Sequence, residues 1–396
     1  MRPTRLLLLF CLAEAFSMAG FSTVPALLPV LQTTWRLSAG EAGALGGSYF
    51  AGYILAISWL SSLTDRIDAR KVFILGALIG GAGSLGFSFL AQGLWSACLF
   101  QAVVGVGLAG TYMPGLRALT DRIEPGLQPR FIAFYTSTFG IGASLSYACA
   151  GWIASQWGWP AAFWVAGLQP LIAGALIWKL IEEKHPAIRP RRSLLHAQWQ
   201  ALKDSKIRHY ILGYAAHCWE LFGFRAWVVA LLTYSGTQGH LPLSAPTLAA
   251  LVNLVGIPAS ILGNESATRG NRQRHVIRVM LLSGILAWIS GFAASSPWLL
   301  ILILPFYFGA VMADSAALTA GLVASTSVHE RGAAMAVYSL GGFGAGLLAP
   351  LCIGFILDLC GGQDHALAWL LACGFLGMWG LLHALHTWRQ EVSAHE

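Results

Sequence analysis

Long apolar runs separated by short polar segments occupy the chain from end to end. Most runs reach about 20 residues, the length that an α-helix needs to cross the hydrocarbon core of a bilayer. The pattern predicts an all-α membrane protein with twelve transmembrane helices, at about residues 6–31, 43–63, 71–91, 94–118, 131–155, 160–181, 209–234, 246–266, 275–294, 297–325, 333–358 and 366–388.

The first run begins like a secretory signal peptide. Arg2 and Arg5 precede a run of leucines, but the apolar stretch continues past Glu14 as far as Val30. A signal peptide has a shorter apolar region and ends at a cleavage site with small residues. We therefore expect an uncleaved first transmembrane helix.

One long polar stretch, residues 182–208, divides the spans into six and six. This predicts an N-terminal six-helix bundle over 1–181, a cytoplasmic linker over 182–208 and a C-terminal six-helix bundle over 209–396. Within the linker, Leu194, Leu195, Trp199 and Leu202 can share one side of a short helix. Such a helix suits the membrane surface, and a solvated connector is the alternative.

The two halves repeat each other. "LTDRIDARK" (63–71) follows the second span and "ATRGNRQRH" (267–275) follows the eighth, and "FGIG" (139–142) corresponds to "FGAG" (343–346) at nearly the same separation. Self-similarity at a fixed separation indicates a duplicated structural unit. Two such bundles place a solute site at their interface near the bilayer midplane.

The distribution of basic residues explains the excess of 24 Lys+Arg over 17 Asp+Glu without a nucleic-acid partner. When the N-terminus is placed in the cytoplasm, nearly all basic loops lie on that side, as the positive-inside rule requires. Both termini are then cytoplasmic. A composition of 56% hydrophobic and 10% charged residues agrees with a multi-pass protein of a cell membrane, and we expect the bacterial inner membrane.

The loop after the second span carries a resemblance to a known family. "SSLTDRIDARK" is similar, at Leu63, Asp65, Arg66, Arg70 and Lys71, to the signature loop of the major facilitator superfamily, although Ser61 and Asp68 replace its glycines. The second copy keeps Gly270 and Arg272 but has Ala267 in place of the aspartate. The resemblance covers essentially the whole chain and implies two six-helix bundles that transport a small solute by alternating access.

Two further motifs of the superfamily are absent. The fourth span has Gln101 and Val104 where the family's Arg-x-x-Gln-Gly motif has arginine and glutamine, and the fifth span lacks the proline of the antiporter motif. A drug/proton antiporter is therefore disfavoured. The resemblance also implies that Asp65, Arg66, Arg70 and Arg272 gate the cytoplasmic side by charge pairs between the halves, with a plain solvated turn as the alternative.

By the same resemblance, the first, fourth, seventh and tenth spans line a central cavity. Three of these spans carry an acidic residue at membrane depth: Glu14 in the first span of the chain, Glu220 in the seventh and Asp314 in the tenth. A charge at that depth is expensive and usually marks a pathway or proton relay. We expect the three acids to carry protons for coupling, against the alternative of buried structural ion pairs.

The stretch "AAHCWELFGFRAW" (215–227) adds His217 and Arg225 to Glu220. His217 and Glu220 share a helix face, so His217 is expected to gate protonation of Glu220 or to be a hydrogen-bonded packing residue. Arg225 points elsewhere. It is expected either to pair with a carboxylate on another helix, Glu14 or Asp314, or to bind a substrate anion.

Aromatic and polar residues of the same spans complete the candidate substrate site: Trp219, Trp227, Tyr112 and Gln101. In membrane helices, such aromatic residues more often serve packing. "GVGLAG" (105–110) has the spacing of a dinucleotide-binding loop but lies inside a span with no preceding strand, so close helix packing by small residues explains it better.

These features predict a secondary active transporter, not an enzyme, that carries a small organic solute together with protons. Symport of an anionic or zwitterionic solute is preferred. An uncoupled facilitator, an efflux antiporter of a cationic, drug-like or metal-chelate substrate, and a transporter-like membrane sensor remain alternatives. No cofactor and no resident metal are expected, since "HCWE" has no second ligand set. A monomer in the lipid bilayer is expected.

Overall fold

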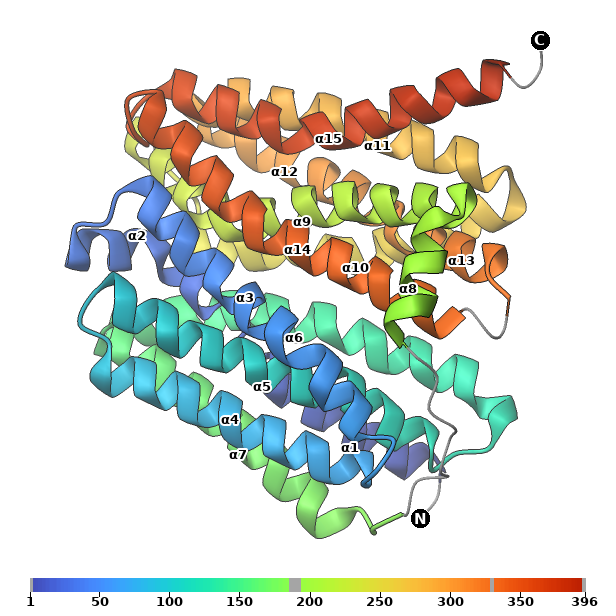
Figure 1. Cartoon of the computed structure of the whole chain (residues 1–396). Helices are drawn as coiled ribbons and strands as arrows, with labels where there is room; N and C mark the ends of the chain where they lie inside the picture. Colours follow the sequence, from blue (N-terminus) through green and yellow to red (C-terminus); the bar gives the residue numbers. More distant parts are fainter. Residues whose placement is uncertain (1–2, 185–193, 328–330, 394–396) are drawn as a thin grey trace. The chain divides into compact units, whose positions relative to one another are not determined.

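The computed structural model describes residues 3–184, 194–327 and 331–393, and every regular element among them is helical. The elements before the linker are α1 (Pro3–Met18), α2 (Thr23–Trp35), α3 (Ala39–Leu63), α4 (Ala69–Leu90), α5 (Leu94–Thr120), a 3-10 turn (Pro125–Leu127), α6 (Gln128–Trp157) and α7 (Trp159–Leu180). Figure 1 shows their order along the chain.

The remaining elements begin inside the predicted linker. They are α8 (Leu194–Lys203), α9 (Ser205–Gln238), α10 (Ala245–Arg269), α11 (Arg272–Phe292), a 3-10 turn (Ala293–Ser295), α12 (Pro297–Ala313), α13 (Ser315–Ser325), α14 (Arg331–Leu359) and α15 (Ala366–Ser393). The α8 helix packs onto α9 and α14, where Ala201 is buried with Ile207 and Tyr338. Leu194 and Leu195, half of the predicted apolar side of this helix, have side chains outside the described set.

Eleven spans among the described residues are long and apolar enough to cross a membrane. The remaining predicted span corresponds to α6, which has 30 residues but is more polar because serines and threonines interrupt its apolar sequence. The all-α membrane fold is therefore confirmed. Two compact units divide the chain, one with residues 1–37 and 44–190 and the other with residues 38–43 and 191–396.

Polar side chains start several helices. Asp68, Asp204, Ser244 and Asn271 occupy the N-cap positions of α4, α9, α10 and α11, and each accepts a hydrogen bond from a backbone N–H of the first turn. These residues satisfy donors that a helix leaves without intrahelical partners. Gly158 separates α6 from α7 with φ of 82°, a left-handed conformation that favours glycine.

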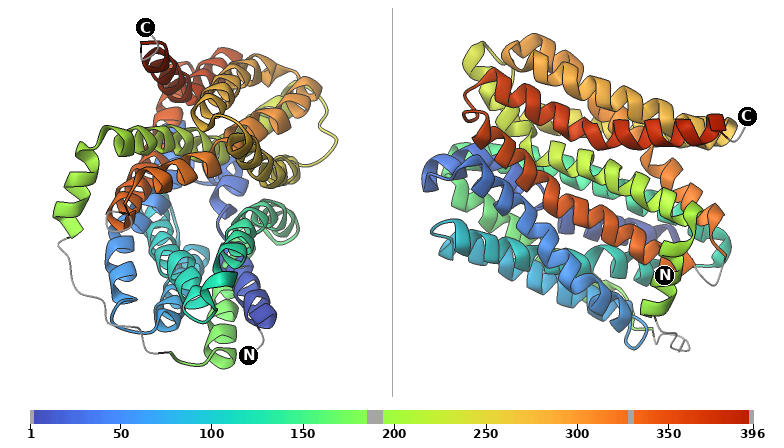
Figure 2. Two further views of the ribbon diagram at one scale, coloured as in Figure 1. Left: turned by 90° about the vertical axis from the view of Figure 1, so that its right-hand side faces the viewer. Right: turned by 45° about the horizontal axis from the view of Figure 1, so that its top comes forward.

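Small residues bring helices of the first unit into backbone contact. A Cβ on Gly107 of α5 would lie 2.4 Å from Cα of Gly80 on α4, and one on Gly105 would lie 1.9 Å from the carbonyl oxygen of Tyr49 on α3. The packing role predicted for "GVGLAG" is confirmed. In the second unit, α11 lies along α15 and α9 lies along α14, and both views of Figure 2 show these pairs side by side.

The first and tenth predicted spans are each broken into two helices, whereas the sequence pattern predicted continuous ones. The first is interrupted between α1 and α2 at Ala19–Ser22, where the Ser146 hydroxyl of α6 accepts a hydrogen bond from the Ser22 N–H at 2.9 Å. The tenth is interrupted at Asp314, between α12 and α13. Interrupted membrane helices are tolerated where protein groups re-satisfy the freed backbone.

Candidate functional site

Glu14 lies on α1, inside the first unit, with its side chain fully buried. The Tyr135 hydroxyl of α6 is 2.7 Å from Glu14 Oε2 and 3.0 Å from the carbonyl oxygen of Tyr112 on α5. Glu14 Oε1 has no hydrogen-bond partner among the described residues. The carboxyl group thus meets a neutral hydroxyl group at the junction of three helices.

Aromatic rings enclose this carboxyl group. Tyr112 stacks on Tyr135 with ring centroids 6.2 Å apart, and Tyr49 of α3 lies close enough to interact electrostatically with Glu14. Tyr112, predicted to bind substrate, therefore belongs to the surroundings of Glu14. Gln101 is also buried on α5 but lies eleven residues earlier, roughly 16 Å along the helix axis. The structure does not bring Gln101 beside Glu14.

Glu220 occupies a comparable place inside the second unit. The Ser283 hydroxyl of α11 donates to Glu220 Oε2 at 3.0 Å, and Glu220 Oε1 has no hydrogen-bond partner among the described residues. The Tyr307 hydroxyl of α12 lies near Glu220, but it does not meet the geometric criteria for a hydrogen bond to it. Gly380 of α15 backs the group, since a Cβ there would lie 3.4 Å from Glu220 Oε2.

His217 lies 2.7 Å from Asp314, measured from Nδ1 to Oδ1, and both side chains are buried. One of the two roles expected for His217 was to gate protonation of Glu220, and the structure places Asp314 beside His217 instead. Although His217 and Glu220 are three residues apart on α9, Glu220 turns to α11, whereas His217 meets the break between α12 and α13. His275 of α11 also binds at this break, with Nε2 3.1 Å from the carbonyl oxygen of Ala313.

Arg225 is buried on α9 and is held by an amide and an aromatic ring. Its Nε donates to Asn253 Oδ1 of α10 at 3.0 Å, and its guanidinium carbon lies 5.6 Å from the ring centroid of Phe308. Asp314, one of the two carboxylates expected to pair with it, contacts His217 instead. The amide at Asn253 was not among the expected partners.

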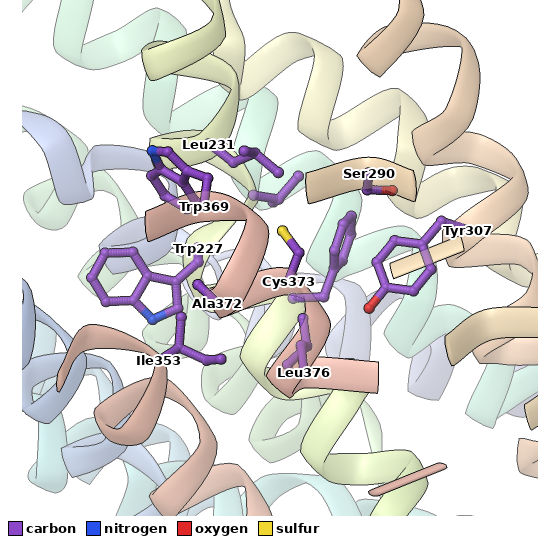
Figure 3. A pocket seen from close by; sticks show the side chains of 11 residues that line it. Trp227, Leu231, Ser290, Tyr307, Ile353, Trp369, Ala372, Cys373 and Leu376 are labelled. Atoms are coloured by element: carbon purple, nitrogen blue, oxygen red, sulfur yellow. The ribbon is translucent and has the colours of Figure 1, made fainter. Parts of the chain in front are cut away.

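The two candidate tryptophans have packing environments in the second unit. Trp219 makes edge contacts with Phe375 and Trp379 of α15. The Trp227 Nε1–H donates to the carbonyl oxygen of Pro350 at 2.9 Å, and its ring lines a cavity of about 20 Å³ beside Trp369. Figure 3 shows Trp227 and Trp369 beside this cavity, whose exposed lining is apolar and which is too small for an organic solute.

A second cavity of about 20 Å³ lies inside the first unit, at the break between α1 and α2. Ser17, Gly20, Tyr49 and Thr111 contribute to its wall, and Ser17 Oγ has no hydrogen-bond partner among the described residues. A space of this size with polar edges can hold about one water molecule. This cavity lies at the C-terminal end of α1, where the helix break begins, a few residues after Glu14.

The loop between α3 and α4 is organised by two aspartates within the first unit. Asp65 Oδ1 accepts a hydrogen bond from Arg117 of α5 at 2.7 Å. Asp68 is buried, and its carboxylate accepts hydrogen bonds from Arg122 at 2.5 Å and from the Lys184 N–H at 2.7 Å. Asp68, which the sequence comparison treated only as a replaced glycine, is the better-connected of the two.

The other residues predicted to gate the cytoplasmic side have separate positions. Arg70 donates to carbonyl oxygens of Ile177 and Trp178 at the end of α7, and Arg66 is exposed. Arg272 begins α11, and its Nε has no partner among the described residues. Their gating role stays a prediction.

Asp68 should give the protein a pH-dependent stability. Burial raises its pKa, but hydrogen bonds from Arg122 and the backbone N–H groups of Lys184 and Arg70, with the charge of Arg122, outweigh burial and hold the pKa below its ordinary value. A carboxyl group with a lowered pKa stabilises the fold above the ordinary aspartate pKa of about 3.9, and this contribution is lost as the pH falls through the lower folded-state pKa.

Asp68→Asn is expected to lower the melting temperature at neutral pH by roughly a few degrees, because asparagine still caps α4 but removes the charge. The difference from the wild type should shrink below about pH 4. Thermal melts in detergent between pH 3 and 8 measure this, with Asp364→Asn, an exposed site, as the control. A difference that is constant down to pH 3 would contradict the assignment.

Several contacts of these sites were missed from sequence. Tyr135, Ser283 and Asn253 are polar residues inside apolar runs, and His275 lies in the basic stretch at the start of α11. None of these settings reveals which helix the side chain faces. Asp68 did carry a signal, because an aspartate directly before a helical run is a preferred N-cap. Among the described residues, no group of three histidine, cysteine or acidic side chains is arranged to hold a metal ion.

The sequence matches the family profile of the Major Facilitator Superfamily over residues 10–277. This is more than half of the chain, and the chain belongs to that superfamily.

Two curated relatives resemble parts of the chain. It is 24% identical over 186 residues to NiaP of Bacillus subtilis, to which niacin/nicotinamide transport is provisionally assigned, covering 47% of this chain and 46% of that protein. It is 23% identical over 245 residues to the gentisate transporter of Corynebacterium glutamicum, covering 58% and 54%. The chain thus spans about half the length of the curated relatives it matches.

Solved structures match nearly the whole fold. A bacterial homologue of the human lysosomal transporter Spinster, in an inward-facing and occupied conformation, has a TM-score of 0.80 at 17% identity, with 97% of this chain and 96% of that chain covered. At this identity the likeness shows the fold alone.

Proposed function

We propose that the protein is a proton-coupled transporter of a small organic carboxylate that works by alternating access. Membership of the superfamily supports a transport function in general. The proton coupling is supported by the environment of the two buried glutamates, and the class of substrate by Arg225 together with the names of the curated relatives.

The environment of Glu14 and Glu220 carries the proposal. Each lies inside one unit, and its nearest polar partner is a neutral hydroxyl group, Tyr135 or Ser283, with no basic side chain paired to it among the described residues. A buried carboxylate without a counter-ion is costly and readily takes up a proton. Such groups can bind and release protons without breaking an ion pair, whereas an acid in a structural salt bridge stays charged.

Both carboxyl groups are closed off from solvent in this conformation. Proton exchange therefore requires that the helices around them move. The helix breaks near Glu14 and at Asp314 are suited to such movement, because interrupted helices often form the binding and coupling sites of transporters. The pair of His217 and Asp314 lies at the second of these breaks.

The substrate that fits these observations best is a small aromatic carboxylate. Gentisate, and niacin in its acid form, each carry one carboxylate on an aromatic ring, and the guanidinium of an arginine binds carboxylates in a planar fork. Arg225 would supply this contact if helix movement exposes it. Symport with a proton would bring the charge of a monocarboxylate across without net charge transfer.

The orientation and the gate belong to the same proposal. We propose that both termini lie in the cytoplasm of a bacterial inner membrane, which the excess of basic residues in the loops of one side supports. Asp65, at the loop between α3 and α4, is proposed to stabilise the outward-facing state. Asp65→Asn is then the variant that shifts the protein toward inward opening, while an unchanged accessibility of engineered cysteines would count against the gate.

Uptake of radiolabelled gentisate and nicotinate by proteoliposomes tests the proposal. With the outside acidic, uptake above that at equal pH is expected, after subtraction of protein-free liposomes, since protonated aromatic acids also cross lipid unaided. Protein-dependent uptake that is the same with and without the pH gradient would indicate an uncoupled facilitator. Absence of protein-dependent uptake of both solutes would remove aromatic carboxylates as the substrate class.

A further inference from the structure

One hydroxyl group in the first unit lies within hydrogen-bond distance of two acceptors. Tyr135 of α6 approaches Glu14 Oε2 at 2.7 Å and the carbonyl oxygen of Tyr112 at 3.0 Å. A phenol has a single O–H proton and can donate only one of these bonds. The second contact is favourable only when the other partner is itself a donor.

The carbonyl oxygen of Tyr112 is an acceptor in every state, so the donor must be Glu14. A neutral carboxyl group has one O–H, which can donate to the Tyr135 oxygen while the Tyr135 O–H donates to Tyr112. An ionised carboxylate has no proton to give. The Tyr135 O–H would then donate its hydrogen bond to the carboxylate, because hydrogen bonds to charged acceptors are stronger than those to neutral ones. The hydrogen bond to the carbonyl oxygen of Tyr112 would be lost.

We infer that Tyr135 is a positioning residue that couples the protonation of Glu14 to the contact between α6 and α5, with the described structure corresponding to the protonated form. The inference rests on the proposed proton-coupled function and extends it. When Glu14 releases its proton to one side of the membrane, the Tyr135 hydroxyl changes acceptor and α5 loses a buried hydrogen bond.

Neighbouring residues hold the Tyr135 hydroxyl in its position between the two acceptors. A Cβ on Gly115 of α5 would lie 2.4 Å from the Tyr135 hydroxyl oxygen, so only glycine at this position allows the hydroxyl its place between the two acceptors. The titratable groups facing Glu14 are Tyr135 from α6, Tyr112 from α5, Tyr49 from α3 and Cys11 from α1 itself. None of these side chains is basic.

Infrared spectroscopy of the purified protein tests the inference without any substrate. The C=O band of protonated Glu14 is identified by its loss in Glu14→Gln and followed with pH. In Tyr135→Phe the ionised form loses its charge-assisted hydrogen bond, so the band should persist to a pH about one unit higher than in the wild type. Tyr147→Phe, which removes another buried hydroxyl group from α6, should leave the band unchanged.

Gly115→Ala provides a second variant that keeps the tyrosine. The added methyl group should displace the Tyr135 hydroxyl from Glu14 and change the pH at which the Glu14 C=O band disappears. Tyr135→Phe removes the hydroxyl group itself, whereas Gly115→Ala only displaces it. An identical titration in the wild type, Tyr135→Phe and Gly115→Ala would overturn the inference, as would a wild-type band that is absent at every pH.

Transport assays separate this inference from the proposed function. If the band moves in Tyr135→Phe but the wild type shows no gradient-driven uptake, the hydrogen-bond exchange stands and the transport proposal falls. If uptake is gradient-driven and its pH profile is the same in the wild type and in Tyr135→Phe, the coupling role assigned to Tyr135 falls while the proposed function stands.

Discussion

Glu14→Gln is expected to abolish solute accumulation driven by a pH gradient while the exchange of solute across the membrane at equal pH continues. Glutamine has the shape of a neutral carboxyl group and can still bond to Tyr135, so the helix junction should survive. It has no proton to release. Accumulation above equilibrium therefore loses its driving force, whereas the movement that exposes a solute site on either side needs no net proton transfer.

Gradient-driven uptake and counterflow in the same proteoliposomes measure the two activities side by side. Glu265→Gln, at an exposed position with an Arg269 partner, is the matched control and should accumulate solute normally. Glu220→Gln, assayed in parallel, shows whether the second buried acid carries a proton too. Full accumulation by Glu14→Gln would exclude Glu14 from coupling.

Gly105→Ala is expected to damage the first unit severely. Its methyl group would lie 1.9 Å from the carbonyl oxygen of Tyr49, and this neighbour is backbone that cannot rotate away. Helices α3 and α5 would have to separate, at a cost of about 3 kcal/mol or more, the upper end of the usual penalty for overpacking. We expect a low yield of monodisperse protein and a large drop in melting temperature.

Gly344→Ala is the matched control for this substitution. It also adds one methyl group to a glycine inside a long helix, but nothing lies within 4 Å of the new Cβ among the described residues. Relief of glycine flexibility should make it neutral or more stable by roughly 0.5–1 kcal/mol. Equal melting temperatures for the two variants would show that α3 and α5 do not pack as closely as described.

The sequence pattern predicted the membrane spans well because bilayer thickness sets a helix length that local composition reveals. The packing role of "GVGLAG" was predictable for a similar reason, since small residues at helical spacing have few other uses in a membrane. The breaks at Ala19–Ser22 and Asp314 were not predicted. The residues of the first break are no more polar than others in their span, and an acidic residue inside a span does not by itself indicate a break. The printed contacts at the two breaks come from Ser146 and His275, on other helices.

The burial of the candidate residues was predictable from the sequence, but their partners were not. Membrane depth singled out Glu14, Glu220 and Asp314 because charge there is expensive. Spacing along α9 suggested that His217 would serve Glu220, yet a side chain meets whichever helix packs against its face, and for His217 this is the break at Asp314. Arg225 likewise found Asn253, an amide that nothing in its own sequence neighbourhood indicated.

Proton movement coupled to solute movement is the most direct test of the central claim, that the buried carboxyl groups carry protons during transport. Proteoliposomes containing a trapped pH-sensitive dye are given an inward gradient of gentisate or nicotinate at equal pH, with protein-free liposomes subtracted. The wild type is expected to acidify the lumen as solute enters, and Glu14→Gln is expected not to. Entry of solute through the wild-type protein with no protein-dependent change in luminal pH would contradict the account.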